Sequence, residues 1–281
     1  MLKGDTNKMR ILRLWAPSLI GDHTLCYIHT NREGKSCINE VAIPVKFAPA
    51  GKKLDAKKYD SAMTIVLPPD AKMNDGDFLS VESGVLLRWN KKHDAFEVCE
   101  SGFLGVSEQA EILTPIRTAV LTVSDKGSRG EREDTAGPEL ERLAFTQGCV
   151  TEERKIVPDD PEAICAAVCE CSEKGINLIL TTGGTGLSPR DNTPEALLSI
   201  ADKTVPGFGE MMRIGTLMYT PRSFLTRSVA VIKGRSLIIA FPGSKRGAGQ
   251  CFEAITGGLR HAVETLTGRA TECGGGHGHR H

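Results

Sequence analysis

The feature that most constrains the fold is a regular alternation of apolar runs with longer, helix-compatible segments after residue 115. The apolar runs cover residues 118–123, 153–157 and 178–181, and the segments that alternate with them cover residues 137–146, 161–174 and 194–201. Strands that alternate with helices of this length predict an α/β domain with a parallel sheet, because each crossover carries a helix back over the sheet. We therefore expect helices on both faces of a mostly parallel sheet.

The pattern continues to residue 268. A further helix is predicted at residues 209–219, two strands at residues 229–232 and 236–241, and a closing helix at residues 248–266. We therefore place one domain at residues 116–268.

Residues 1–113 have a different character. Their apolar runs are short, strand-like and separated by turn signals, and they cover residues 11–15, 41–47, 63–67, 78–81 and 85–89. One such signal is Asn74-Asp75-Gly76, in which Gly76 can take the positive φ that a tight turn needs. This half is predicted to be a small β-rich domain.

Charge and cysteine content exclude several classes of protein. Lys plus Arg equals Asp plus Glu at 35 each, which removes the overall attraction that nucleic-acid and anionic-membrane binders carry. No apolar stretch approaches the ~18 residues of a spanning helix, and the first fifteen residues lack the pattern of a secretory signal. The nine cysteines form no disulfide framework. We expect a cytoplasmic protein that binds neither nucleic acid nor membrane.

Small polar residues follow three of the predicted strands, where open α/β sheets bind their ligands. They are Ser124 and Asp125 after the first strand, Thr182, Gly183, Gly184, Thr185 and Gly186 after the third, and Pro242, Gly243 and Ser244 after the last. Glycine lets backbone N–H groups approach phosphate oxygens without a clash from a Cβ atom. The glycine loop lacks the spacing of the dinucleotide fingerprint and the ending of the Walker sequence, yet it can bind phosphate by the same physics.

Two aspartates near these loops lack an evident structural role. Asp160 precedes a proline and is predicted to cap a helix, which leaves Asp159 without a structural partner. Likewise Thr193 is predicted as a cap, which leaves Asp191 free on the loop. Two spare carboxylates beside a phosphate site favour a Mg²⁺ ion, and turn or cap chemistry is the alternative for each aspartate taken singly.

Four cations lie near predicted strand or helix ends and could offset phosphate charge, or could simply be solvated at the surface. They are Arg190, Arg213, Arg227 and Lys245.

Two other segments raise the question of a metal site. Cys165 and Cys169 share a helix face, with Cys171 on the other side, but without a second pair they favour buried small side chains over a metal site. The tail at residues 269–281 is rich in glycine and histidine and is predicted to be flexible. Its histidines could bind a transition metal ion, or the tail could be a disordered end that binds none.

Taken together, these segments resemble the molybdopterin adenylyltransferase family, which includes the bacterial Mog and MoaB proteins and the G domains of gephyrin and its plant counterpart. The resemblance covers about residues 116–268 and is carried, in order, by Thr122-Val123-Ser124-Asp125, Pro158-Asp159-Asp160, Thr181-Thr182-Gly183-Gly184-Thr185-Gly186, Arg190-Asp191-Asn192-Thr193-Pro194, Val205-Pro206-Gly207-Phe208-Gly209-Glu210-Met211-Met212-Arg213 and Pro242-Gly243-Ser244.

The resemblance implies a three-layer molybdopterin-binding fold, usually trimeric, that transfers AMP from Mg·ATP to the terminal phosphate of molybdopterin and releases pyrophosphate. It implies that Asp159 and Asp191 are the functional, metal-associated aspartates. It also implies that the three strand-end loops line the nucleotide and pterin-phosphate pocket, and it places Arg190, Glu210 and Arg213 in matching segments. A molybdenum insertase would be a partner, and the residues do not distinguish molybdenum from tungsten cofactor. The alternative is a carrier or scaffold that holds molybdopterin without turnover.

Two features depart from the family pattern. Lys245-Arg246 follows the Pro-Gly-Ser turn where the family usually continues with proline, so rigidity is lost and two cations are gained. Residues 1–113 lie outside the resemblance and are only faintly similar to the MOSC domains that accompany molybdenum-cofactor proteins, without their cysteine signature. Their role is hypothesised to be docking of a cofactor or partner.

Overall fold

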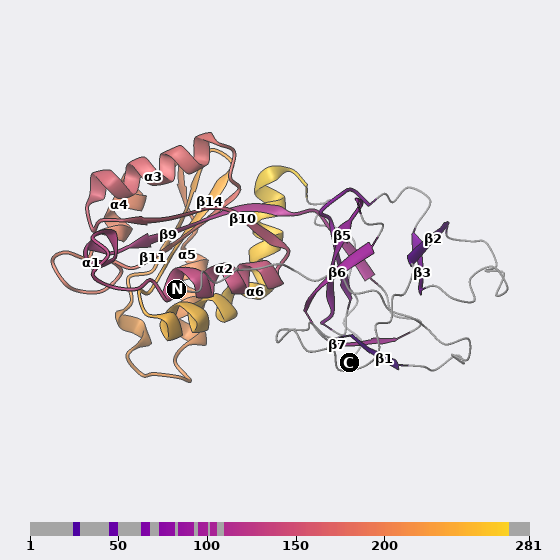
Figure 1. The fold of residues 1–281 in the computed structure, drawn as a ribbon. Coiled ribbons are helices and arrows are strands. Elements are labelled where there is room, and N and C mark those ends of the chain that lie inside the picture. The colour runs from indigo at the N-terminus through magenta and orange to yellow at the C-terminus, as the bar shows by residue number, and fades with distance from the viewer. Residues whose placement is uncertain are drawn as a thin grey trace, which may run out of the picture. The chain divides into compact units, whose positions relative to one another are not determined.

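The computed structural model describes residues 25–28, 45–49, 63–67, 73–81, 84–92, 95–100, 102–105 and 110–269. The chain divides into two compact units, Met1–Pro115 and Ile116–His281 (Figure 1). The predicted strand at residues 11–15 and the tail after residue 269 lie outside the described residues. The assignment of separate functions to residues 1–113 and 116–268 stays a prediction.

The described residues of the first unit are mainly β-strands, as predicted. An antiparallel sheet has the order β6-β5-β4-β8 and consists of β4 (Phe78–Val81), β5 (Leu86–Asn90), β6 (Ala95–Glu100) and β8 (Ala110–Leu113). Two further pairs are the antiparallel β1 (Leu25–Ile28) and β7 (Gly102–Gly105), and the parallel β2 (Val45–Pro49) and β3 (Met63–Leu67).

The predicted turn before β4 is present. Gly76 has a φ of +84°, and the backbone N–H of Asp77 donates to the Asn74 carbonyl oxygen at 3.1 Å. The Asp77 carboxylate in turn accepts the Asn74 backbone N–H at 2.7 Å. The expected positive φ is therefore confirmed, and the turn is reinforced by a side chain that is itself buried.

The second unit contains a six-stranded sheet with the order β10-β9-β11-β14-β13-β12. Its strands are β9 (Ile116–Val123), β10 (Cys149–Val157), β11 (Leu178–Thr182), β12 (Lys203–Thr204), β13 (Ala230–Lys233) and β14 (Ser236–Phe241). The first four in spatial order run parallel, β13 pairs antiparallel with β14, and β12 pairs antiparallel with β13. The central strands β11 and β14 are buried along their whole length, as continuous apolar runs in parallel sheets usually are.

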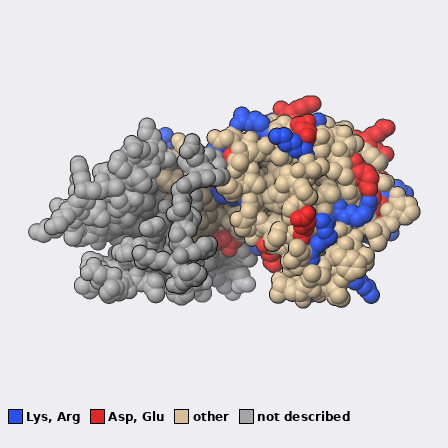
Figure 2. Space-filling model, turned by 180° about the vertical axis from the view of Figure 1, so that it is seen from behind, with Lys and Arg blue, Asp and Glu red and all other residues tan. Residues whose placement is uncertain are grey.

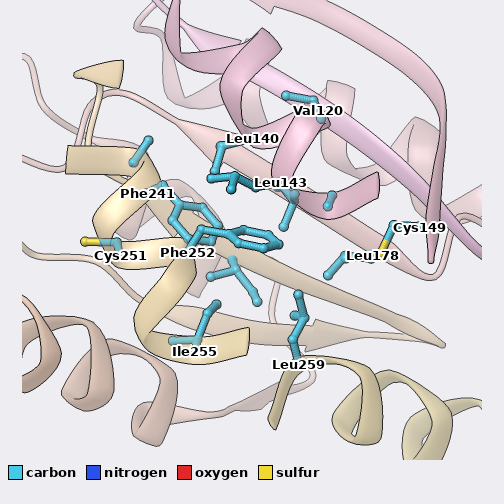
Figure 3. Close-up of a cluster of buried hydrophobic side chains, with 14 of the residues drawn as sticks. Val120, Leu140, Leu143, Cys149, Leu178, Phe241, Cys251, Phe252, Ile255 and Leu259 are labelled. Carbon is cyan, nitrogen blue, oxygen red and sulfur yellow. The ribbon is translucent and has the colours of Figure 1, made fainter. Parts of the chain in front are cut away.

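Helices cover both faces of this sheet, which confirms the three-layer expectation (Figure 1). They are α1 (Asp125–Ser128), α2 (Ala136–Thr146), α3 (Pro161–Glu173), α4 (Thr193–Ser199), α5 (Pro206–Gly215), the short 3₁₀ helix η2 (Ser223–Leu225) and α6 (Lys245–Thr267). One apolar cluster packs α2, α5 and α6 on the sheet, and a second packs α3 and α4 on the other face. In the first cluster the rings of Phe241 and Phe252 lie 6.0 Å apart (Figure 3).

The boundaries of helices α5 and α6 differ most from the prediction. Helix α5 begins at Pro206 rather than residue 209, because a proline suits the first helical position, and it ends at Gly215 rather than residue 219. Helix α6 begins at Lys245 rather than residue 248, because Ser244 caps it. The departure Lys245-Arg246 is therefore the first turn of a helix rather than a loop.

Basic and acidic side chains of the second unit lie interspersed on the face drawn in Figure 2, in keeping with the equal counts of the two charges. Among the described residues, no helix combines the length and the apolar character that crossing a bilayer requires.

Candidate functional site

An open cavity of about 690 Å³ lies beyond the carboxyl ends of the parallel strands β9, β11 and β14. Its size falls within the ~300–1,000 Å³ typical of small-molecule sites. The predicted site residues that line it are Ser124, Asp159, Thr182, Gly183, Gly184, Thr185, Gly186, Asp191, Pro242, Gly243 and Ser244. The structure thus brings the three predicted strand-end loops and both predicted aspartates together.

The glycine loop at residues 183–186 can be built only from small residues. Gly183 and Gly184 have φ angles of +109° and +62°. A Cβ on Gly183 would lie 2.2 Å from the Val123 carbonyl oxygen, and one on Gly184 would lie 2.3 Å from the Thr193 hydroxyl. The N–H groups of the last three loop residues donate to no acceptor in the described part of the chain. They are therefore available to an anion.

The Pro-Gly-Ser turn brings a helix N-terminus to the same cavity. The Thr182 hydroxyl donates to the Pro242 carbonyl oxygen at 2.8 Å, which fastens the turn to β11. The Ser244 hydroxyl accepts the Gly247 backbone N–H at 3.1 Å and so caps α6, which continues for 23 residues. The free N–H groups and the partial positive charge of a long helix N-terminus both favour an anion.

Asp159 lies just after β10 and has an unsatisfied carboxylate. Its Oδ1 is buried and accepts no hydrogen bond, whereas the next residue, Asp160, caps α3 by accepting the Ala163 N–H at 2.9 Å, as predicted. Burial raises the pKa of the Asp159 carboxyl, and the negative charges of Asp125 and Asp191 raise it further. Burial of an anionic oxygen without a partner is energetically costly, which makes this atom a candidate ligand for a cation.

Asp191 is less free than the sequence indicated. Its Oδ2 accepts the Ser188 backbone N–H at 2.9 Å, and its own N–H donates to the Ser188 carbonyl oxygen at 2.9 Å. The prediction that Thr193 caps α4 is wrong, because the cap position is Asn192 and Thr193 is the first helical residue. Thr193 is instead fully buried, with its hydroxyl next to Gly184. One carboxylate oxygen of Asp191 thus stabilises the turn.

Four predicted residues, in addition to the cations Arg227 and Lys245, do not line the cavity. Asp125 forms an ion pair with Arg190, and its Oδ1 accepts the Asp159 backbone N–H at 3.1 Å. The pair therefore lies behind Asp159 and fixes its backbone. On α5, Arg213 donates to the Ser228 carbonyl oxygen at 3.3 Å, and Glu210 is exposed. The binding roles of these four residues stay predictions.

The sequence reasoning missed several cavity residues on the segment before α2. Asp134 accepts the Gly137 backbone N–H at 2.9 Å and the Thr122 hydroxyl at 2.8 Å, so it joins α2 to the end of β9. An aspartate three residues before a helical N–H is a capping pattern that could have identified it. Arg132 and Glu133 also line the cavity, and no periodic pattern marks them.

The charge of the cavity argues for a cation. Glu133, Asp134, Asp159 and Asp191 against Arg132 leave a formal charge of −3 on its lining. Phosphates would be repelled by this lining unless a cation accompanied them. In the described residues no group of three His, Cys, Asp or Glu side chains is placed to hold a metal alone. Mg²⁺ often uses one or two carboxylates together with substrate phosphates, and Asp159 and Asp191 fit that donor set.

Two other predictions are corrected or refined. Cys165 and Cys169 are half-buried rather than buried, and the buried cysteine of α3 is Cys171, where burial raises the pKa of the thiol to about 11. Lys245 lies 3.7 Å from Glu139 of α2, so it forms an ion pair at the surface.

The second unit of the chain is similar to proteins of known name. A family model described as "Probable molybdopterin binding domain" matches residues 119–261. The chain is 35% identical over 156 residues to the molybdopterin adenylyltransferase of Helicobacter pylori strain J99, which covers 54% of this chain and 89% of that protein. It is 36% identical over 147 residues to the enzyme of the same name from Escherichia coli K12, with 51% and 75% covered.

Solved structures of related proteins also match about half of this chain. The molybdopterin biosynthesis enzyme MoaB from Thermus thermophilus is 43% identical with a TM-score of 0.52, over 54% of this chain and 97% of that one. The tungsten cofactor synthesizing protein MoaB from Pyrococcus furiosus is 32% identical with a TM-score of 0.51, over 56% and 99%. Each match covers little more than half of this chain.

Proposed function

The chain belongs to the molybdopterin-binding family whose model matches it, and on that premise we propose that it is a molybdopterin adenylyltransferase. It would transfer AMP from ATP to the terminal phosphate of molybdopterin and release pyrophosphate, in the biosynthesis of molybdenum or tungsten cofactor. The Helicobacter pylori and Escherichia coli relatives carry that name. One further relative is named for molybdenum cofactor biosynthesis, and one solved structure is named for tungsten cofactor synthesis.

The observation that carries the proposal is the orphaned carboxylate oxygen of Asp159 beside the free N–H groups of the glycine loop. A binding protein for a phosphorylated pterin needs the N–H donors but gains nothing from a buried, unpaired carboxylate, which destabilises the fold. An enzyme that handles a metal-bound triphosphate does need it. This favours catalysis over simple carriage.

The chemistry requires no strong general base. An oxygen of the pterin phosphate attacks the α-phosphorus of ATP, a new P–O bond forms, and the bond to the pyrophosphate oxygen breaks with its electron pair. The nucleophile is already anionic at neutral pH, so the barrier lies in bringing two anions into line and in stabilising the leaving group. Fixed N–H donors that are already oriented serve both needs.

Different parts of the cavity would bind the phosphates and the metal ion. The N–H groups at residues 184–186 and the N-terminus of α6 would hold phosphate oxygens, with Ser244 fixing the helix end. Asp159 and Asp191 would hold Mg²⁺, which when bound neutralises charge on the phosphates. Asp125 would keep Asp159 in place through its backbone N–H. Arg132 is the cation of the cavity lining and would contact a phosphate directly.

The setting of the enzyme is a further part of the proposal. A cytoplasmic location suits the free cysteines of the described residues, and a molybdenum insertase would receive the product. Large apolar side chains are exposed on α5 and after it, namely Met211, Ile214, Leu217, Met218 and Phe224. Copies of this chain would cover them in a homotrimer, which light scattering coupled to size-exclusion chromatography would test.

The function is tested by incubating the purified full-length chain with molybdopterin, ATP and Mg²⁺. We expect adenylylated pterin and pyrophosphate in equal amounts, and neither product without molybdopterin or in excess chelator. Tight binding of molybdopterin with no product would refute the enzyme and leave the carrier.

A further inference from the structure

Arg227 ties the glycine loop to the segment that carries Asp191. Its Nε donates to the Gly186 carbonyl oxygen at 2.7 Å, across 41 positions of sequence. Its two terminal nitrogens contact the Asp191 carbonyl oxygen and the Glu195 carboxylate. The backbone N–H of Arg227 donates to the Thr185 carbonyl oxygen at 3.0 Å. One residue thus holds two consecutive loop carbonyls and a third beside them.

These contacts fix which way the loop peptides point. In a planar trans peptide the carbonyl and the following N–H point in opposite directions. Because Arg227 takes the carbonyls of Thr185 and Gly186, the N–H groups of Gly186 and Leu187 lie on the opposite side. Neither N–H donates to an acceptor in the part of the chain that the structure describes, and both residues line the cavity. Arg227 thus donates to the loop carbonyl oxygens, and the loop N–H groups remain available to a ligand.

Arg227 itself is not among the residues that line the cavity, and its side chain is 32% exposed. Its side-chain contacts are with the loop, the Asp191 carbonyl oxygen and Glu195, outside the cavity lining. Its planar fork reaches three separate acceptors from three different nitrogens, whereas a lysine presents all of its donors from one nitrogen. The Glu195 carboxylate is exposed, so its ion pair with Arg227 stabilises the loop less than the two carbonyl contacts do.

We propose that Arg227 is a positioning residue that makes the glycine loop a polyphosphate-binding site. By holding the carbonyls of Thr185, Gly186 and Asp191 it aims the loop N–H groups at the phosphates of a nucleoside triphosphate, and it holds the loop against the Asp191 segment. The proposal deepens the adenylyltransferase assignment and rests on it for the identity of the nucleotide.

The test compares wild type with Arg227→Lys in the full chain. We expect the dissociation constants for Mg·ATP and for inorganic pyrophosphate to rise by about tenfold or more, because the loop N–H groups lose their fixed direction. In turnover, KM for ATP should rise more than kcat falls. Amide hydrogen exchange of residues 183–187 should become faster, whereas the core strands should exchange as in wild type. A residue that only supported the fold would speed exchange throughout and leave the ratio of KM to kcat unchanged.

Two control variants separate the contacts. Glu195→Gln removes the ion pair and keeps the carbonyl contacts, so ATP affinity should stay within about twofold. Arg154→Gln removes an exposed arginine that pairs with Glu141 at 3.1 Å and should leave ATP affinity unchanged. Wild-type binding of both probes by Arg227→Lys, with unchanged exchange of the loop, would overturn the proposal.

A measurement on wild type keeps the proposal testable if the lysine variant does not fold. Pyrophosphate should protect the amides of Gly186 and Leu187 from exchange, and lack of protection at saturation would overturn the proposal. These binding measurements need no molybdopterin. Loop protection without adenylyl transfer would therefore refute only the enzyme assignment, and transfer without loop protection would refute only the role of Arg227.

Discussion

Two kinds of carboxylate occur on and near strand β10, and their surroundings differ in opposite ways. On the strand and on α3, Glu153 and Glu170 face Lys155 and Lys174, with Lys155 Nζ 2.8 Å and Lys174 Nζ 2.7 Å from Glu170 Oε1. These pairs lower the pKa of both glutamates, that of Glu170 to about 2. Two residues beyond the strand, Asp159 is half-buried and its pKa is raised.

The difference distinguishes a structural carboxylate from a functional one. Glu153 and Glu170 each form ion pairs with both lysines, so folding favours the charged form of each glutamate. Asp159 has Asp125 and Asp191 as electrostatic neighbours, and the nearby cation Arg190 is paired with Asp125. A perturbed group that local structure does not satisfy, placed in a cavity, is a candidate for function.

The largest effect that would test this contrast is on catalysis. Asp159→Asn and Asp191→Asn should each reduce adenylyl transfer by about two to four orders of magnitude while leaving pterin binding largely intact, because each removes a carboxylate proposed to hold Mg²⁺. In the Asp191→Asn variant the amide oxygen of the new side chain can still accept the Ser188 N–H, so the turn should persist. Pyrophosphate release measures the loss. Glu170→Gln is the matched control, and unchanged turnover in both aspartate variants would refute the assignment of the metal site.

The strand-end part of the site could be predicted from the sequence because a parallel sheet gathers the carboxyl ends of its strands. Ser124, Thr182 and Ser244 are far apart in the chain, yet the order of strands and helices is enough to bring them to one edge. The orphaned state of Asp159 was also predictable, since Asp160 accounts for the cap of α3.

The remaining site residues depend on tertiary approach, which no local pattern records. Arg227 follows a 3₁₀ turn and reaches a carbonyl 41 residues earlier, so its sequence neighbours say nothing of its partners. The spacing of Asp134 to α2 could have identified its cap, but not its contact with Thr122, which lies 12 residues away in the sequence. The hydrogen bond from Ser188 to Asp191 was missed because a short turn leaves no periodic signal.

An effect of intermediate size concerns stability without metal. The folded pKa of Asp159 lies above the unfolded value of ~3.9, so its carboxyl contributes stability at low pH, and this contribution is lost as pH rises through the folded pKa. Near pH 7 the metal-free Asp159→Asn variant should therefore be more stable than wild type by on the order of 1 kcal/mol, or roughly 2–4 °C in Tm.

Thermal unfolding between pH 4 and pH 8 in chelator checks this expectation. The advantage of the variant should grow as pH rises, and Mg·ATP should raise the Tm of wild type much more than that of the variant. If the variant were less stable than wild type at every pH in this range, the Asp159 carboxylate would have a partner in the fold and would not be available to bind a cation.

The smallest expected effect is on the stability that the paired glutamates contribute. Its dependence on pH has the opposite sign to that of Asp159. The folded pKa of Glu170 is about 2, below the unfolded value of ~4.3, so its ion pairs contribute stability above about pH 4, and that contribution is lost as pH falls towards 2. Because Glu170 and Lys174 are exposed and Lys155 is only half-buried, Glu170→Gln should lower the Tm only slightly at neutral pH, and high salt should shrink the difference. Turnover should not change. A large loss of activity in Glu170→Gln, measured by pyrophosphate release, would remove the distinction between the two groups of carboxylates.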